Sequence, residues 1–141
     1  MTIKQLSVFL ENREGRLEEV LNTLKEEKIN IISLSLADTS DYGMLRILVE
    51  EPERGKDALK AKGFSATLSD IVAVTLPHKI GALQETLHIL YEAGINIEYM
   101  YALSTGTEDA SVVIKTSELE KAAKLLDGTE VELVSASEIQ A

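Results

Sequence analysis

An internal repeat constrains what this chain can fold into more than any other feature of its sequence. Shifting the sequence by 66 positions brings twelve of the thirty-four residues from Leu6 to Thr39 onto an identical residue. Most of the matches lie between Gly15 and Ile31, whose copy runs from Gly81 to Ile97. Self-similarity at one fixed offset indicates one structural unit used twice. We therefore expect two modules, residues 1–69 and 70–141. A unit of that size buries only about 60% of its unfolded surface, so we expect the two to pack together.

Each copy begins with a change of hydrophobic period. Apolar side chains alternate with polar ones through residues 2–10, which predicts a half-buried strand. After Gly15 the apolar residues follow at i, i+3, i+4 and i+7, which predicts an amphipathic helix. They are Leu17, Val20, Leu21 and Leu24. Asn12 is the predicted N-cap of this helix, because its side-chain oxygen can accept a free amide proton.

The remaining elements of each copy follow in the order strand, strand, helix, strand. In the first copy the strands are expected at residues 31–36, 44–50 and 64–69, with a short helix between Pro52 and Gly63. The second copy repeats the order, and we expect the tail beyond Ser135 to be loosely held. The sequence therefore predicts an α+β fold of two ferredoxin-like βαββαβ modules, each an antiparallel sheet with its helices on one face.

Apolar side chains fall on both faces of the second strand of each copy. In the first copy we expect Ile32, Leu34 and Leu36 to oppose Ile31, Ser33 and Ser35. In the second copy we expect Ile97, Tyr99, Tyr101 and Leu103 on one face. The open face of an antiparallel sheet is normally polar. We therefore expect another sheet or a second chain to cover it, and predict a homodimer formed through sheet or helix faces.

Composition excludes several classes of function. The formal charge of −10 argues against nucleic acid as a partner, because phosphate binding needs clustered lysine and arginine. No apolar run approaches the roughly twenty residues of a membrane span, so no membrane partner is expected. The chain has no cysteine, which excludes disulfides and thiolate chemistry, and we expect it in the cytoplasm.

Catalytic motifs are also lacking. There is no nucleophile elbow, no phosphate-binding glycine loop and no metal-ligand cluster, so we expect neither an enzyme nor a cofactor. An acylphosphatase-like reaction would need an arginine in the first loop, which Arg13 or Arg16 supplies. The second copy has only Lys79 and Ala82 at those positions, which disfavours this alternative.

The turn and strand-start motifs of both copies resemble those of the ACT domain. The first copy reads Glu-Asn-Arg-Glu-Gly-Arg-Leu over residues 11–17 and Lys-Ile-Asn-Ile over residues 28–31. The second reads Pro-His-Lys-Ile-Gly-Ala-Leu over residues 77–83 and Ala-Gly-Ile-Asn-Ile over residues 93–97. The resemblance covers essentially the whole chain as two tandem modules. It implies a βαββαβ regulatory module that binds amino acids and often controls amino-acid biosynthetic enzymes.

The resemblance also implies where a ligand binds. In family members with an Asn-Arg-Pro-Gly turn, such as the regulatory end of phosphoglycerate dehydrogenase, that turn and the Asn opening the second strand contact the ligand. Glu14 departs from this pattern, since proline is usual there, and His78 stands in place of Asn12. Carried over with their neighbours, the expected ligand-binding residues are Asn12, Arg13, Glu14, Gly15, Asn30, Ile31, His78, Lys79, Ile80, Gly81, Asn96 and Ile97.

These residue types suit an α-amino acid. A helix N-terminus offers free amide protons and about half a positive charge to the carboxylate. Glycine admits the ligand close to the backbone, and Asn30 or Asn96 has both a donor and an acceptor. The alternative is structural: the glycines relieve strain in a tight turn, and the asparagines bond local backbone at a strand start.

Two non-catalytic functions follow from the resemblance. In the first, the chain is an amino-acid sensor, with a free amino acid held at the glycine turn and the start of the second strand, at a module interface. In the second, it is the regulatory subunit of a separate biosynthetic enzyme, much as the small subunit of acetolactate synthase resembles an ACT module. In either case the ligand stabilises the assembly that it binds best, which is allosteric regulation by linkage.

Overall fold

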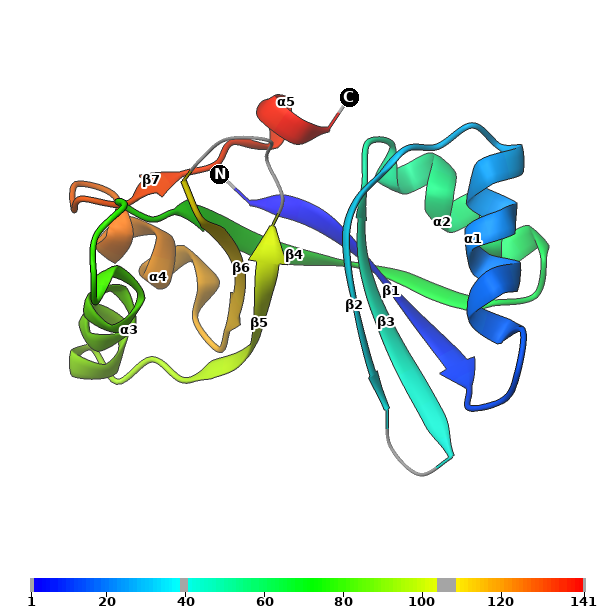
Figure 1. Cartoon of the computed structure of the whole chain (residues 1–141), viewed down its shortest axis with the longest axis horizontal. Helices are drawn as coiled ribbons and strands as arrows, with labels where there is room; N and C mark the ends of the chain where they lie inside the picture. The colour runs from blue at the N-terminus through cyan, green and yellow to red at the C-terminus, as the bar shows by residue number, and fades with distance from the viewer. Residues whose placement is uncertain (1, 39–40, 104–108, 141) are drawn as a thin grey trace. The chain divides into compact units, whose positions relative to one another are not determined.

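A computed structural model describes residues 2–38, 41–103 and 109–140 of the chain (Figure 1). The chain forms two compact units. The first comprises residues 4–69 together with Ile139 and Gln140, among the described residues. The second comprises residues 70–138 together with Thr2 and Ile3. Each unit is therefore assembled from both ends of the chain.

The first unit is a four-stranded sheet with two helices on one face (Figure 1). Its elements are β1 (Ile3–Glu11), α1 (Arg16–Glu26), β2 (Ile31–Asp38), β3 (Tyr42–Val49), α2 (Pro52–Ala61) and the start of β4 (Ser65–Thr75). The sheet order is β2-β3-β1-β4, and β3 is antiparallel to both β1 and β2. The predicted βαββαβ module is confirmed here.

The second unit repeats this arrangement. Its elements are the end of β4, α3 (Ala82–Glu92), β5 (Ile97–Leu103), β6 (Ser111–Thr116), α4 (Leu119–Leu126) and β7 (Glu132–Leu133), followed by the short helix α5 (Ala136–Ile139). The strand β4 pairs with β6 on one side and β7 on the other, so the order is β7-β4-β6-β5. The predicted α+β fold of two ferredoxin-like modules is confirmed. The last strand of the first module and the first strand of the second were expected to be separate, and they form the single continuous strand β4.

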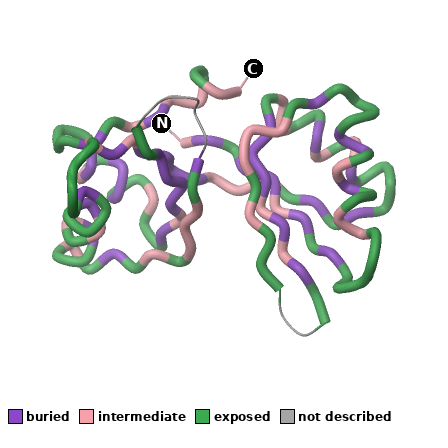
Figure 2. Tube along the Cα trace, in the orientation of Figure 1, coloured by how far each residue is buried: buried purple, intermediate pink, exposed green. Residues whose placement is uncertain are grey.

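The hydrophobic core of each unit lies between the sheet and the two helices. Val8, Ile47 and Leu24 centre the first core, and Val74, Ile114 and Leu90 occupy the matching places in the second. Figure 2 shows the buried positions running along the strands, with exposed positions at the turns. Leu24 and Leu90, which the repeat aligns, are both fully buried.

A β-bulge changes which residues of β2 and β5 face the helices. The register shifts between Ile31 and Ser33 in β2, and between Ile97 and Tyr99 in β5. An extra residue at that point inverts the alternation of faces. Ile31, which packs against the core, therefore lies on the same sheet face as Leu34, which pairs with the core residue Ile47 but is itself 42% exposed. The predicted opposition of Ile31 to Leu34 was wrong, because a period of two does not reveal a single inserted residue.

The bulge has the same effect in β5. Ile97 packs against the second core together with Met100, not on one face with the two tyrosines as predicted. The rings of Tyr99 and Tyr101 stack on each other, with centroids 6.5 Å apart.

Two further predictions about the ends of elements were wrong. Asn12 is not the N-cap of α1: Gly15 takes that position, and no side chain caps the helix. The tail beyond Ser135 is not loose, since α5 follows and the Gln140 amide donates hydrogen bonds to the carbonyl oxygens of Lys4 (2.6 Å) and Val49 (3.3 Å).

Candidate functional site

The first candidate site is the turn that joins β1 to α1. The backbone amide of Asn12 donates to the carbonyl oxygen of Asp41 at 3.0 Å, which ties the start of the turn to the residue before β3. Gly15 then adopts a left-handed conformation, with φ at +83°, and begins the helix without a side-chain cap. A residue with a Cβ is strained in that conformation, so glycine fits a backbone requirement here. The first-turn amides of α1 are therefore left without a capping side chain.

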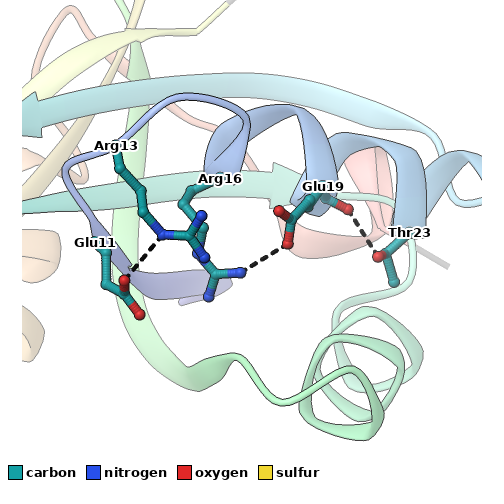
Figure 3. Close-up of polar contacts among 5 residues, drawn as sticks. All are labelled: Glu11, Arg13, Arg16, Glu19 and Thr23. Carbon is teal, nitrogen blue, oxygen red and sulfur yellow. Dashed lines mark hydrogen bonds and ion pairs between the residues drawn. The ribbon is translucent and has the colours of Figure 1, made fainter.

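Both arginines beside this turn are already paired with carboxylates (Figure 3). Nε of Arg13 lies 3.0 Å from Glu11, and both side chains are more than half exposed. Nη1 of Arg16 lies 2.7 Å from Glu19, and its guanidinium stacks over the ring of Phe64, 4.4 Å from the centroid. Arg16 is thus a fixed part of the first unit, whereas Arg13 sits at the solvent-facing turn.

The second candidate site is the turn that joins β4 to α3, and it has the same construction. The amide of Leu76 donates to the carbonyl oxygen of Ala110 at 2.8 Å, and the amide of Lys79 donates to that of Pro77 at 2.9 Å. Gly81 is left-handed, with φ at +84°, and begins α3 without a side-chain cap. The repeat therefore preserves a glycine-capped helix N-terminus in both units.

The side chains around the second turn differ from those around the first. Lys79 places its ammonium 2.6 Å from Glu130 and 3.1 Å from Glu85. These contacts raise the pKa of Lys79 above its ordinary value, chiefly through the hydrogen bond to Glu130 and then through that to Glu85. Ile80 is fully exposed, and His78 is exposed beside it. The second turn thus presents an apolar side chain where the first presents Glu14.

Asn30 and Asn96 hold the same backbone position but differ in their side chains. Their carbonyl oxygens accept hydrogen bonds from the amides of Glu50 (3.1 Å) and Ser117 (3.3 Å). The Asn30 amide also donates to the Glu50 carboxylate at 3.0 Å. Ser117 is too short for such a contact, and the Asn96 side chain makes no hydrogen bond to the residues that the structure describes. Ile31 and Ile97, which follow the asparagines, pack against the cores.

The turn and the asparagine of one unit lie at opposite ends of a helix. The eleven residues of α1 separate Gly15 from Asn30, and the eleven of α3 separate Gly81 from Asn96. At 1.5 Å per residue, each helix holds the two parts about 16 Å apart. An amino acid cannot bridge that distance. A ligand bound at the turn of one unit therefore does not reach the asparagine of the same unit.

A cavity that the sequence did not predict adjoins the second turn, and we call it the α3 cavity. Its volume is about 280 Å³. It is lined by Pro77, Lys79, Ala82, Glu85, Thr86, Ile89, Thr129, Glu130 and Val131. Of these, only Lys79 was expected at a site. The sequence signal was the mismatch between copies, where Ala82 replaces Arg16.

Two classes of site find no support in the described part of the chain. No group of three or more His, Cys, Asp or Glu residues is arranged there to hold a metal ion. None of the helices in that part is long and apolar enough to cross a membrane.

Comparison with known proteins places the chain among ACT-domain proteins. The sequence model of the ACT domain pair matches residues 1–141. Protein BT0572 from Bacteroides thetaiotaomicron has a similar structure, with a TM-score of 0.91, 40% identity, and coverage of 99% of this chain and 96% of that one. No curated protein sequence matches the chain.

Two regulatory subunits share the fold at low identity. The ligand-free regulatory subunit of aspartate kinase from Thermus thermophilus gives a TM-score of 0.62 at 18% identity, covering 88% of this chain and 90% of that one. The regulatory subunit of aspartate kinase from Thermus flavus gives 0.61 at 16% identity, with the same coverage. At this identity the likeness shows the fold alone.

Proposed function

Because this chain belongs to the family of ACT domain pairs, a regulatory module, we propose that it is a non-catalytic sensor of a free amino acid. The observation that carries this proposal is the repeated glycine-capped helix N-terminus. Gly15 and Gly81 hold nearly the same left-handed φ, and in both units the first-turn amides lack a capping side chain. If the turns served only the fold, Ser, Thr, Asp or Asn at the cap position would suffice, because the side chains of these residues satisfy the first-turn amides.

The proposed ligand contacts follow from the charges of an α-amino acid. Its carboxylate accepts hydrogen bonds from the free amides of α1 or α3, where the helix dipole also favours a negative charge. Its ammonium group donates to the side-chain oxygen of an asparagine at the start of β2 or β5. No cofactor or metal takes part.

We expect the two turns to bind with unequal affinity, and the second to bind more tightly. Asn30 is engaged by Glu50, so a ligand must compete with that contact, whereas the Asn96 side chain is free among the described residues. Glu14 places a carboxylate beside the first turn, and the ligand's carboxylate is repelled by it. Ile80 has no such charge.

A second copy of the chain is the proposed source of the missing half of each site. The α3 strip, which consists of Ile80, Leu83, Leu87 and Tyr91, lies along the outer side of α3 at helical spacing. Leu83 is 37% exposed, Tyr91 is 74% exposed and Ile80 is fully exposed. Exposed apolar side chains grouped in this way mark an interaction surface. Because Ile80 precedes Gly81, a homodimer partner on the strip would also close over the turn.

A calorimetric and thermal-shift screen of the twenty amino acids tests the sensor function. At a concentration a thousand times Kd, a ligand adds about 4 kcal/mol to the free energy of unfolding. Asn96→Ala should weaken binding by about tenfold or more, since a charge-assisted hydrogen bond is lost. Asn22→Ala, on the exposed face of α1, is the matched control and should bind normally. The absence of a thermal shift with any amino acid at millimolar concentration would refute the proposal.

A regulatory subunit of a separate enzyme is the second candidate function. It is favoured by the Thermus thermophilus protein, which is described as a regulatory subunit and of which 90% is covered by the match. A biosynthetic enzyme would then be the partner, and both would act in the cytoplasm. Affinity purification of the tagged chain from its native cells should recover a catalytic polypeptide in a fixed ratio. If the chain is recovered alone and still binds an amino acid, the result would contradict the regulatory-subunit function and support the free-standing sensor.

A further inference from the structure

The α3 cavity has the size and lining of a small-molecule site. Its volume of about 280 Å³ is near the lower end of the range for ligand pockets, which begins at about 300 Å³. Its wall is mainly apolar, with Ala82, Ile89 and Val131 contributing carbon surface. Its charged groups are joined by ion pairs, since Lys79 contacts both Glu85 and Glu130, and we call these three residues the charged side of the cavity.

In the first unit an arginine side chain stands at the equivalent position, beside a smaller cavity of about 200 Å³ that Glu19, Thr23 and Phe64 help to line. Arg16 occupies the position of Ala82, and its guanidinium lies 2.7 Å from Glu19 and 4.4 Å from the centroid of Phe64. The equivalent of Glu19 is Glu85, which lines the α3 cavity. Figure 3 shows the arginine extended along α1 toward Glu19. The second unit therefore retains the carboxylate that binds this guanidinium but lacks the arginine.

The charged residues that line the cavity also favour a cationic ligand. Glu85 and Glu130 supply two carboxylates and Lys79 supplies one ammonium, so the charged side carries a net charge of −1. An anion would face both carboxylates. A cation can take Glu85 while Lys79 keeps its shorter contact, 2.6 Å, with Glu130. The hydroxyl of Thr86 is already used, because it donates to the carbonyl oxygen of Ala82 at 2.9 Å.

We propose that the α3 cavity is a binding site for a small organic cation, a guanidinium group on a short aliphatic stem. The guanidinium bonds to Glu85 as Arg16 bonds to Glu19. The stem packs on Ala82 and Ile89. This site shares Lys79 with the second turn, but it does not rest on the amino-acid site, since Asn96 and the first-turn amides of α3 take no part.

Methyl NMR of the full-length chain tests the proposal with two isosteric probes. Ethylguanidinium carries the charge, and N-ethylurea is its neutral counterpart. Ethylguanidinium at millimolar concentration should shift the methyl signals of Ala82 and Ile89 in a saturable way, and N-ethylurea should not. Neither probe is an amino acid, so the result is independent of the sensor function. Equal shifts with both probes, or no shift with either, would overturn the proposal.

Variants of the charged side give changes of opposite sign. Glu85→Gln should weaken ethylguanidinium binding by about tenfold, since an ion-paired hydrogen bond is lost. Lys79→Met should strengthen it, because both carboxylates become free for the cation. Glu19→Gln, the matched change in the first unit, should leave binding unchanged. A structural role of these residues alone would not reverse sign between Glu85→Gln and Lys79→Met, so equal effects of the two would contradict the site.

Filling the cavity completes the test. The variant Ala82→Arg restores the arginine of the first unit, and it should abolish binding of ethylguanidinium. A dispersed NMR spectrum verifies that this variant is folded. Binding that persists in the folded variant would place the probe elsewhere. If the variant does not fold, the Glu85→Gln and Lys79→Met pair decides the question.

Discussion

Among single residues, Gly15 and Gly81 are constrained by their left-handed backbone conformation. A Cβ at Gly15 or Gly81 would meet no atom within 4 Å, so the strain of substitution lies in the backbone conformation and not in crowding. We predict that Gly15→Ala and Gly81→Ala each lower the free energy of unfolding by about 1–2 kcal/mol. Asparagine tolerates this conformation better, so Gly81→Asn should cost less than Gly81→Ala. Urea denaturation measures both, and equal stability of Gly81→Ala and the unmodified chain would contradict the prediction.

Lys79 gives a prediction about pH at the same scale. Its pKa is raised in the folded protein, so the stabilisation from its contacts is complete below the ordinary lysine pKa and is lost as the pH rises through the raised value. NMR titration of the Lys79 side chain should give a pKa above that of exposed lysines. Glu130→Gln should lower it more than Glu85→Gln does, because Glu130 is the larger cause. The reverse order would show that the contact with Glu85 dominates.

At the scale of the element, the outer side of α3 differs from that of α1. Tyr91 is 74% exposed, and the residue of α1 that the repeat aligns with Tyr91 is Lys25. If the α3 strip is the homodimer interface, Tyr91→Gln should weaken self-association in sedimentation velocity while changing the free energy of unfolding of the monomer by less than about 0.5 kcal/mol. Lys25→Gln should leave the sedimentation coefficient unchanged. If the unmodified chain sediments as a monomer at micromolar concentration, the α3 strip is not a homodimer interface and the prediction does not hold.

The elements of the fold could be predicted from sequence because the repeat reports the same periodicity twice. The faces of β2 could not, since one bulged residue between Ile31 and Ser33 inverts the alternation. The contact of Asn30 with Glu50 joins residues twenty positions apart, and no local pattern encodes it. The α3 cavity could have been found, because the replacement of Arg16 by Ala82 in one copy is visible in the aligned sequence. Differences between the copies therefore point to features that their identities do not show.

At the scale of the whole molecule, both ends of the chain enter the unit to which they do not belong in sequence. Ile139 and Gln140 join residues 4–69, and Thr2 and Ile3 join residues 70–138. The strand β4 is continuous and supplies a strand to each sheet. A cut at our proposed module boundary, between residues 69 and 70, therefore leaves neither half complete. We infer that the chain unfolds in one cooperative transition.

Matched core substitutions test this inference. Leu24→Ala and Leu90→Ala remove equivalent, fully buried side chains from the two cores, and each should lower the free energy of unfolding by about 2–5 kcal/mol. In a cooperative molecule both variants shift the same single denaturation curve, whether it is followed by circular dichroism or by a fluorescent probe in either unit. Asn22→Ala, which is exposed on α1, should leave the curve in place. If Leu90→Ala instead splits the curve in two, with the first unit unfolding as before, the units are independent. The chain ends would then contribute only local contacts, such as those of Gln140 with Lys4 and Val49.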